Sequence, residues 1–144
     1  MGARYNVNKT STALATTTDA VTITAPAGRS LKIWAIRLYG GAAASAYNEI
    51  LVARSTGGAT PVAITPTPLN ADSAAATFTA ASGWTTQPTL GVTIDRIGVN
   101  ANGAAVQHVY PPGQEIDIPG GGQVSLRSAS GTSAIAISLI VEQV

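Results

Sequence analysis

The chain has 144 residues, a length that suits one domain with a substantial hydrophobic core. Charged residues make up only 10% of it and the net charge is +1, which excludes the strong electrostatic footprint of a nucleic-acid-binding protein. Because there is no cysteine, a disulfide scaffold and a thiolate zinc site are excluded, and no apolar run is long enough for a membrane-spanning helix.

The first part of the chain is polar and rich in threonine. Residues 1–19 predict an extended N-terminal arm, or an edge, ahead of a single β-sandwich domain at 20–144. Apolar and polar residues then alternate from Val21 to Thr24, which is the pattern of a half-buried strand. An extended arm can add a strand to the open sheet edge of a neighbour, so it is a candidate contact element. Its candidate interface residues are Arg4, Tyr5 and Lys9.

A longer strand is predicted at residues 30–39, and its apolar phase changes halfway along. Large apolar side chains fall at odd positions before Trp34 and at even positions after Ala35. One extra residue in a strand reverses the facing of everything after it. We therefore expect a β-bulge near Trp34–Ala35, with Trp34 in the core or beside it.

The middle of the chain carries two loops. Pro61, Pro66 and Pro68 all fall within residues 55–73, which forbids a central strand and predicts a long surface connection. This connection is a second candidate contact element, with Pro66 and Pro68 as candidate interface residues. Trp84 lies in a second, polar loop, where it either anchors a partner protein or covers one end of its own sandwich.

The remaining apolar alternation predicts further short strands. They fall at residues 47–54, 74–80, 90–97, 105–110, 115–118, 123–127 and 133–144. About eight or nine short strands with almost no helical periodicity indicate an all-β fold, an antiparallel β-sandwich. With this number of strands the jelly roll, a double Greek key, is the first choice.

No motif of catalysis or cofactor binding is present. Gly120–Gly122 are followed by a strand pattern and not by Lys and Ser or Thr, so a phosphate-binding loop is excluded. We expect these glycines to supply backbone freedom where two short strands connect. His108 is the only histidine and no Gly-x-Ser-x-Gly elbow occurs, so we expect no enzyme, no metal site and no cofactor.

The few acidic residues have simple structural interpretations. Glu115 and Asp117 are two positions apart on one strand and so share a face, as a pair of catalytic or calcium-binding carboxylates would. The alternation of the strand already explains them as its solvent side. Asp95 is expected to pair across strands with a base such as Arg127.

Several stretches of the chain resemble small structural proteins of tailed-bacteriophage virions. The stretches are RYNVNKTSTALATTTDAVTITAPAGRSLKIWAIRLYG at 4–40, ARSTGGATPVAITPTPLN at 53–70 and PGGGQVSLRSASGTS at 119–133. They are similar to the head decoration, or cement, proteins with a jelly-roll fold. The resemblance rests on local phrases such as AGRSLKI and PTPLN and covers nearly the whole chain.

The resemblance implies a virion structural protein that is made in the host cytoplasm and binds the outer surface of the capsid. Its partners would be the major capsid protein and copies of itself, often as a homotrimer, without nucleic acid, membrane, cofactor or catalytic residue. Three alternatives stay open. A carbohydrate-binding module of a tail fibre or spike would use an exposed Trp84 with Gln87 and Asn102. The others are a self-assembling coat protein and an enzyme built around His108.

Overall fold

The computed structural model describes residues 2–144, and this part of the chain contains twelve β-strands and no helix. Eight strands are long: β1 Ala3–Ala13, β2 Asp19–Thr24, β3 Leu31–Gly41, β4 Tyr47–Thr56, β8 Thr89–Asn100, β9 Asn102–Val109, β11 Gln123–Ser130 and β12 Ala134–Gln143. Four are short: β5 Val62–Ile64, β6 Thr67–Pro68, β7 Thr79–Ser82 and β10 Ile116–Ile118.

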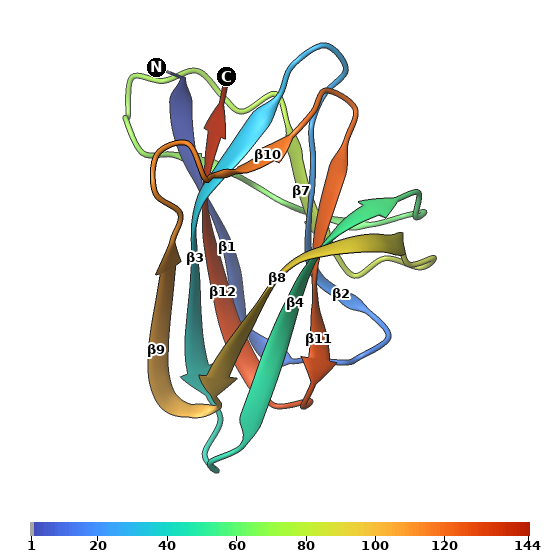
Figure 1. The fold of residues 1–144 in the computed structure, drawn as a ribbon, viewed down its shortest axis with the longest axis vertical. Coiled ribbons are helices and arrows are strands. Elements are labelled where there is room, and N and C mark those ends of the chain that lie inside the picture. Colours follow the sequence, from blue (N-terminus) through green and yellow to red (C-terminus); the bar gives the residue numbers. More distant parts are fainter. Residues whose placement is uncertain (1) are drawn as a thin grey trace.

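The strands form two antiparallel sheets that pack face to face (Figure 1). Sheet A has the order β10-β3-β12-β1-β6, with β9 also paired to β3, and sheet B has the order β5-β7-β2-β11-β4-β8. The long strands alone give β1-β12-β3-β9 and β2-β11-β4-β8, which is the double Greek key of a jelly roll. The predicted fold class is confirmed.

The predicted strand number needs a correction, because there are twelve strands and not eight or nine. The strands that were not predicted are β1, which was expected as an arm, and β5 and β6, which have only three and two residues. A segment of two or three residues is too short to show an alternating pattern. Only its pairing with a neighbouring strand identifies it as a strand. β5 and β6 lie in the proline-rich connection at 55–73 and occupy sheet edges, as prolines require.

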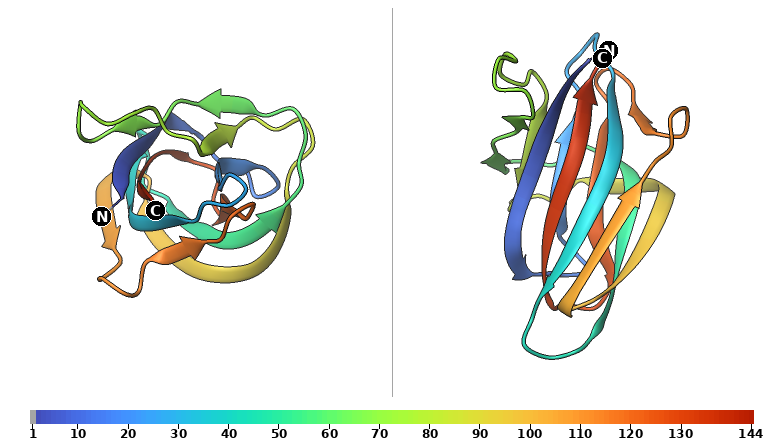
Figure 2. Two further views of the ribbon diagram at one scale, coloured as in Figure 1. Left: turned by 90° about the horizontal axis from the view of Figure 1, so that it is seen from above. Right: turned by 90° about the vertical axis from the view of Figure 1, so that its left-hand side faces the viewer.

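The core lies between the two sheets and follows the predicted alternation (Figure 2, left). In β12 every second side chain is fully buried: Ile135, Ile137, Leu139 and Val141. Burying one such side chain contributes about 1.5–3 kcal/mol.

The predicted β-bulge in β3 is present. Ile33 pairs with Val141 and Ala35 with Ile140, so Trp34 is the extra residue that has no partner in β12. The bulge lets Ile33 and Ile36 both reach the core, where they are fully buried. It also turns the half-buried Trp34 to the outside of sheet A.

The structure corrects the picture of a separate N-terminal arm. Residues 3–13 are strand β1, which pairs with β12 along most of its length and with β6 on its other side. Tyr5 and Val7 from this strand are buried in the core. The apolar residues that reveal a core strand are only two here, and the threonines around them hide the alternation.

The glycine-rich turn between β10 and β11 works as predicted. Gly121 has φ of +77°, a conformation that favours glycine. A Cβ on Gly120 would lie 2.9 Å from the backbone nitrogen of Gly28, so this turn packs directly against the turn after β2. Two hydrogen bonds hold the turns together, from Gly121 to Pro26 at 3.2 Å and from Ala25 to Gly122 at 2.9 Å.

Candidate functional site

The outer face of sheet A is open. Figure 2 (right) shows β1, β12, β3 and β9 side by side with no loop across them. We call this outer surface of sheet A the open face. The strand registers place the following side chains on it: Arg4, Asn6, Lys32, Trp34, Arg37, Tyr39, Val109, Ala136, Ser138, Ile140, Glu142 and Asp117. Tyr39 is 44% exposed and Val109 is 54% exposed. Tryptophan, tyrosine and arginine are the residues that most often anchor protein interfaces.

One end of the open face is a cluster around Glu142. The Arg4 guanidinium lies 4.2 Å from the centre of the Trp34 ring, and Arg4 Nε is 3.5 Å from the Glu142 carboxylate. The Gly2 amide donates to the same carboxylate at 2.8 Å, and the Trp34 indole N–H donates to it as well. Burial disfavours the charged carboxylate, but these donors and the Arg4 charge outweigh it and lower the pKa of Glu142.

The middle of the open face contains an arginine that lacks a partner. Arg37 lies opposite Ser138 on β12 and Gln107 on β9, both of them neutral. Its Nε is shielded from solvent and has no hydrogen-bond partner among residues 2–144. A shielded donor without an acceptor costs free energy, so Arg37 stabilises the monomer less than a fully paired arginine would.

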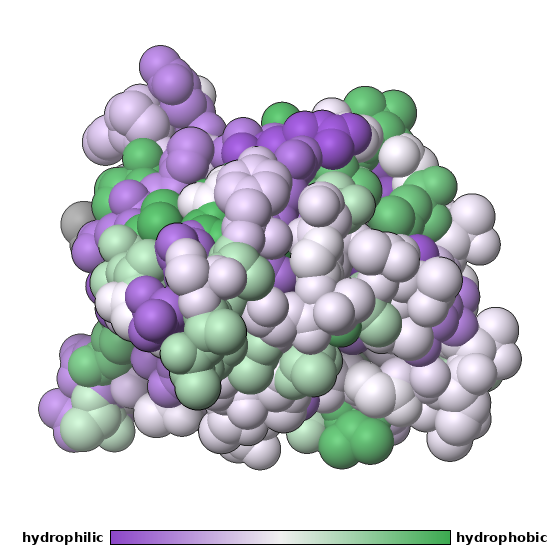
Figure 3. Space-filling view, turned by 90° about the horizontal axis from the view of Figure 1, so that it is seen from below, coloured by the Kyte–Doolittle hydropathy of each residue, from purple (hydrophilic) through white to green (hydrophobic). Residues whose placement is uncertain are grey.

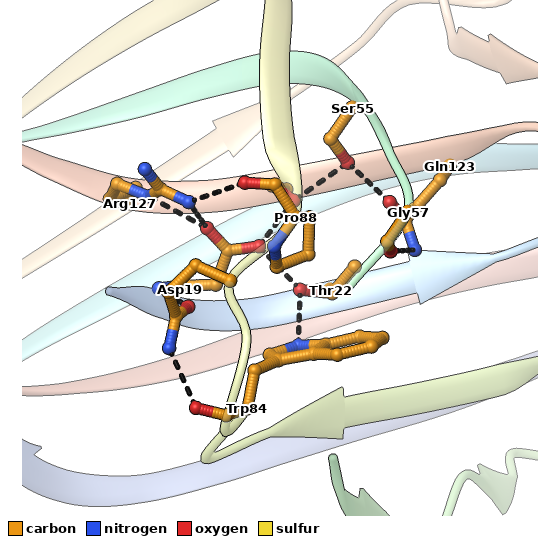
Figure 4. A network of polar contacts seen from close by, with 10 residues as sticks. Asp19, Thr22, Ser55, Gly57, Trp84, Pro88, Gln123 and Arg127 are labelled. Carbon is orange, nitrogen blue, oxygen red and sulfur yellow. Dashed lines mark hydrogen bonds and ion pairs between the residues drawn. The ribbon is translucent and has the colours of Figure 1, made fainter. Parts of the chain in front are cut away.

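The outer face of sheet B is instead covered over part of its area. We call the part of this surface that lies beneath residues 83–89 the covered face. It holds a network of polar side chains: Asp19, Thr22, Ser55, Gln123, Ser125 and Arg127 (Figure 4). The Asp19 carboxylate has no exposed surface, and Arg127 NH2 lies 2.6 Å from it. Asp19 also accepts hydrogen bonds from Thr22 at 2.7 Å and from Ser125. Each buried polar group here has a partner, as stability requires.

Trp84 belongs to this covering loop. Its indole N–H donates to the Thr22 hydroxyl at 3.0 Å, and Thr22 in turn donates to Asp19. Gln87 ties the loop down, since its amide N–H donates to the Trp84 carbonyl at 2.9 Å and its Oε1 accepts the Asp19 amide at 2.8 Å. A Cβ on Gly58 would lie 2.7 Å from the Trp84 ring, so the backbone packs closely on the indole. Trp84 therefore covers its own sheet.

The other predicted interface residues lie in different parts of the structure and do not form one site. Tyr5 is only 1% exposed and its hydroxyl donates to the Ala74 carbonyl at 2.9 Å, so it is a core residue and the prediction of a contact role is corrected. Arg4 lies on the open face. Lys9 and Trp84 line one pocket of about 440 Å³. Pro66 and Pro68 are half-buried in the connection beside β1.

His108 takes part in a cluster that joins the two sheets at one side. Tyr110 donates to Asp95 at 2.8 Å, and His108 Nε2 lies 3.4 Å from the same carboxylate. Burial, followed by the hydrogen bond to Asp95 and by the Asp95 charge, raises the pKa of Tyr110 well above its ordinary value. The expected pair of Asp95 with Arg127 is wrong, because β4 lies between β8 and β11.

The predicted carboxylate pair is on the surface. Asp117 is exposed, and Glu115 accepts the amide N–H of Gly113 at 2.8 Å within its own turn. Among residues 2–144 no group of three or more potential metal ligands gathers in space. The same residues include no helix long and apolar enough to cross a membrane.

The surface is mostly of intermediate hydropathy at the end of the sandwich that holds the β3–β4 and β11–β12 connections. Seen from this end, most of the surface has intermediate hydropathy, with small strongly hydrophilic patches (Figure 3). The β3–β4 connection there has the sequence AAASA at 42–46. Short neutral side chains lose little conformational entropy on being covered, which favours a protein contact at this end also.

Sequence reasoning missed the open face, which Arg37, Tyr39, Val109 and Ile140 form. The signal was present, because these residues have the outward parity of their strands. Which outward residues lie side by side depends on strand order and register, and a single strand does not contain that information. No family model, curated protein or solved structure matches the chain, so the open face is interpreted from its own chemistry.

Proposed function

We propose that this chain is a virion structural protein, a decoration protein that binds the outer surface of a phage head and stabilises it. The observation that carries the proposal is the open face of sheet A, an exposed surface with aromatic and arginine side chains at its centre. The jelly-roll fold, the low charge and the local sequence resemblance agree with it.

The mechanism would be thermodynamic linkage. A protein that binds only the assembled, expanded shell stabilises that state by mass action. Many copies on a symmetric shell act together, so a modest contact at each site becomes strong through avidity. The major capsid protein and further copies of this chain are the partners that this mechanism needs.

The carbohydrate-binding alternative is less well supported by the geometry. It requires Trp84 to present its ring with convergent polar groups. The Trp84 N–H is taken up by Thr22, and both polar ends of Gln87 have partners, the Trp84 carbonyl and the Asp19 amide. These polar groups already have partners, so a sugar would have to displace them.

The test is binding to heads that lack the protein. Empty, expanded heads of the phage that encodes the chain, prepared without its gene product, are mixed with purified protein and sedimented. We expect saturable co-sedimentation at a fixed number of copies per head, and heads that resist heating better. Heads that sediment without the protein at any concentration would refute the proposal.

A further inference from the structure

The open face carries a row of charges of alternating sign. Four residues lie in register across neighbouring strands: Asp117 on β10, Lys32 on β3, Glu142 on β12 and Arg4 on β1. The row therefore runs acid, base, acid, base from one side of the sheet to the other. The same row reversed left to right reads base, acid, base, acid. If the reversed row is laid over the original, each charge therefore faces a charge of opposite sign.

That reversal is what a two-fold axis produces. An axis parallel to the strands, between β3 and β12, stacks the open faces of two copies with the row of one over the row of the other. Asp117 then faces the second copy's Arg4, and Lys32 faces the second copy's Glu142. All four facing pairs are of opposite sign, whereas a face of one sign would repel itself.

The apolar residues match under the same rotation. Trp34 and Ile140 lie on either side of the axis, so each faces the other residue in the second copy. Tyr39 faces the second copy's Ala136, a large side chain over a small one. Apolar surface thus covers apolar surface at two levels of the face, one on each side of Arg37 and Ser138.

The same arrangement places the arginine in the middle of the face over a polar residue of the second copy. Arg37 faces the second copy's Ser138 across the axis. The Ser138 hydroxyl donates its proton to Asn6 at 2.7 Å, so its lone pairs are free to accept.

We propose that the open face is the site at which two copies of this chain bind each other through a two-fold axis parallel to the strands. Aligned sheets pack about 10 Å apart with strands within about 30°, so the rows remain superposed near the axis. The contact is isologous and closes as a dimer, in contrast to the trimer that the resemblance implies. The inference deepens the proposed function and rests on it only for the purpose of the pairing. The open face then serves the contact between copies, which leaves the end of the sandwich with the β3–β4 connection at 42–46 to contact the head.

The first test needs the protein alone. Sedimentation-velocity ultracentrifugation over a concentration series gives the dissociation constant of the wild-type dimer, and Tyr39→Glu places a charge within the covered surface. We expect a dissociation constant at least tenfold higher for this variant, as for loss of an interface anchor. Val92→Glu is the matched control, because Val92 is 75% exposed on β8 of the other sheet; it should leave the dimer unchanged.

A second test does not depend on the stability of a glutamate variant. Because the chain has no cysteine, Ala136→Cys introduces a single thiol close to the proposed axis. A short bismaleimide should convert this variant to covalent dimers, while Val92→Cys should remain monomeric under the same conditions.

The outcomes separate the pairing from the proposed function. A wild-type monomer at all concentrations, a three-fold assembly, or a dimer that Tyr39→Glu leaves intact and Ala136→Cys does not cross-link would each overturn the pairing. None of these results bears on co-sedimentation with heads, which is measured separately. Should Tyr39→Glu lose its folded circular-dichroism spectrum, cross-linking of Ala136→Cys decides.

Discussion

On the outer face of sheet B, Asp19 holds Arg127 beneath a loop, whereas on the outer face of sheet A, Arg4 holds Glu142 with its guanidinium at the surface. The side chains of the first pair are 0% and 13% exposed, and Arg4 is 37% exposed. The buried pair is saturated by neighbouring hydroxyls and has no capacity left for a partner. The open pair retains donors that a second molecule can reach. Similar residue types thus serve the fold on one face and, as we propose, recognition on the other.

The most severe way to break the open face is to remove β1. Deleting residues 2–13 takes away Tyr5 and Val7 and leaves the edge of β12 unpaired. The buried tyrosine alone is worth about 3–5 kcal/mol, against a total domain stability of about 5–15 kcal/mol. We expect no cooperative thermal transition by circular dichroism.

The control for this deletion keeps the strand and changes its exposed positions. Asn8→Ala with Thr10→Ala alters two exposed side chains of β1 and should melt near the wild-type temperature. A truncated chain that melts like the wild type would restore the view of residues 1–19 as a dispensable arm.

The next effect in size concerns the covered face. Asp19→Ala leaves the Arg127 guanidinium buried without its counter-charge, which costs about 3–5 kcal/mol. Denaturant unfolding measures the loss, and Asp72→Ala, in an exposed turn, is the control that should change stability by less than about 0.5 kcal/mol.

The double variant sharpens this result. Replacing Arg127 by Met together with Asp19→Ala removes both charges, so it should cost less than Asp19→Ala alone. If Asp19→Ala lies within about 1 kcal/mol of the wild type, the network does not hold the fold as we argue.

The sequence was sufficient for the long strands other than β1 because they carry a clear alternation. In β12 the buried positions fall at every second residue, and in β3 the change of phase located the bulge at Trp34. These features are local, so a single strand contains all the information that they need.

The sites depend on contacts that no local pattern encodes. Asp19 and Arg127 are 108 positions apart, and their pairing follows from β2 and β11 being neighbours in sheet B. The row of charges on the open face likewise joins four strands from both ends of the chain. Topology had to be known before either could be found.

The smallest effect concerns pH and the open face. The pKa of Glu142 is lower in the folded protein than its ordinary value of 4.5. A group with a lowered pKa contributes stability above its unfolded pKa and loses it as the pH falls through the folded pKa. We therefore expect the wild type to lose about 1 kcal/mol or less from this site between neutral pH and the acid side of 4.5.

Glu142→Gln removes this contribution, so its unfolding free energy should depend less on pH in that window than that of the wild type. Urea unfolding at a series of pH values measures the difference. Glu49→Gln is the comparison: the hydrogen bond from Arg96 at 2.7 Å also lowers the pKa of Glu49, but solvent screens this exposed pair, so this variant should change the pH dependence less than Glu142→Gln. Equal pH profiles for Glu142→Gln and the wild type would mean that the Gly2, Trp34 and Arg4 donors do not favour the Glu142 carboxylate. The open face would then lack the fixed acid on which its charge row depends.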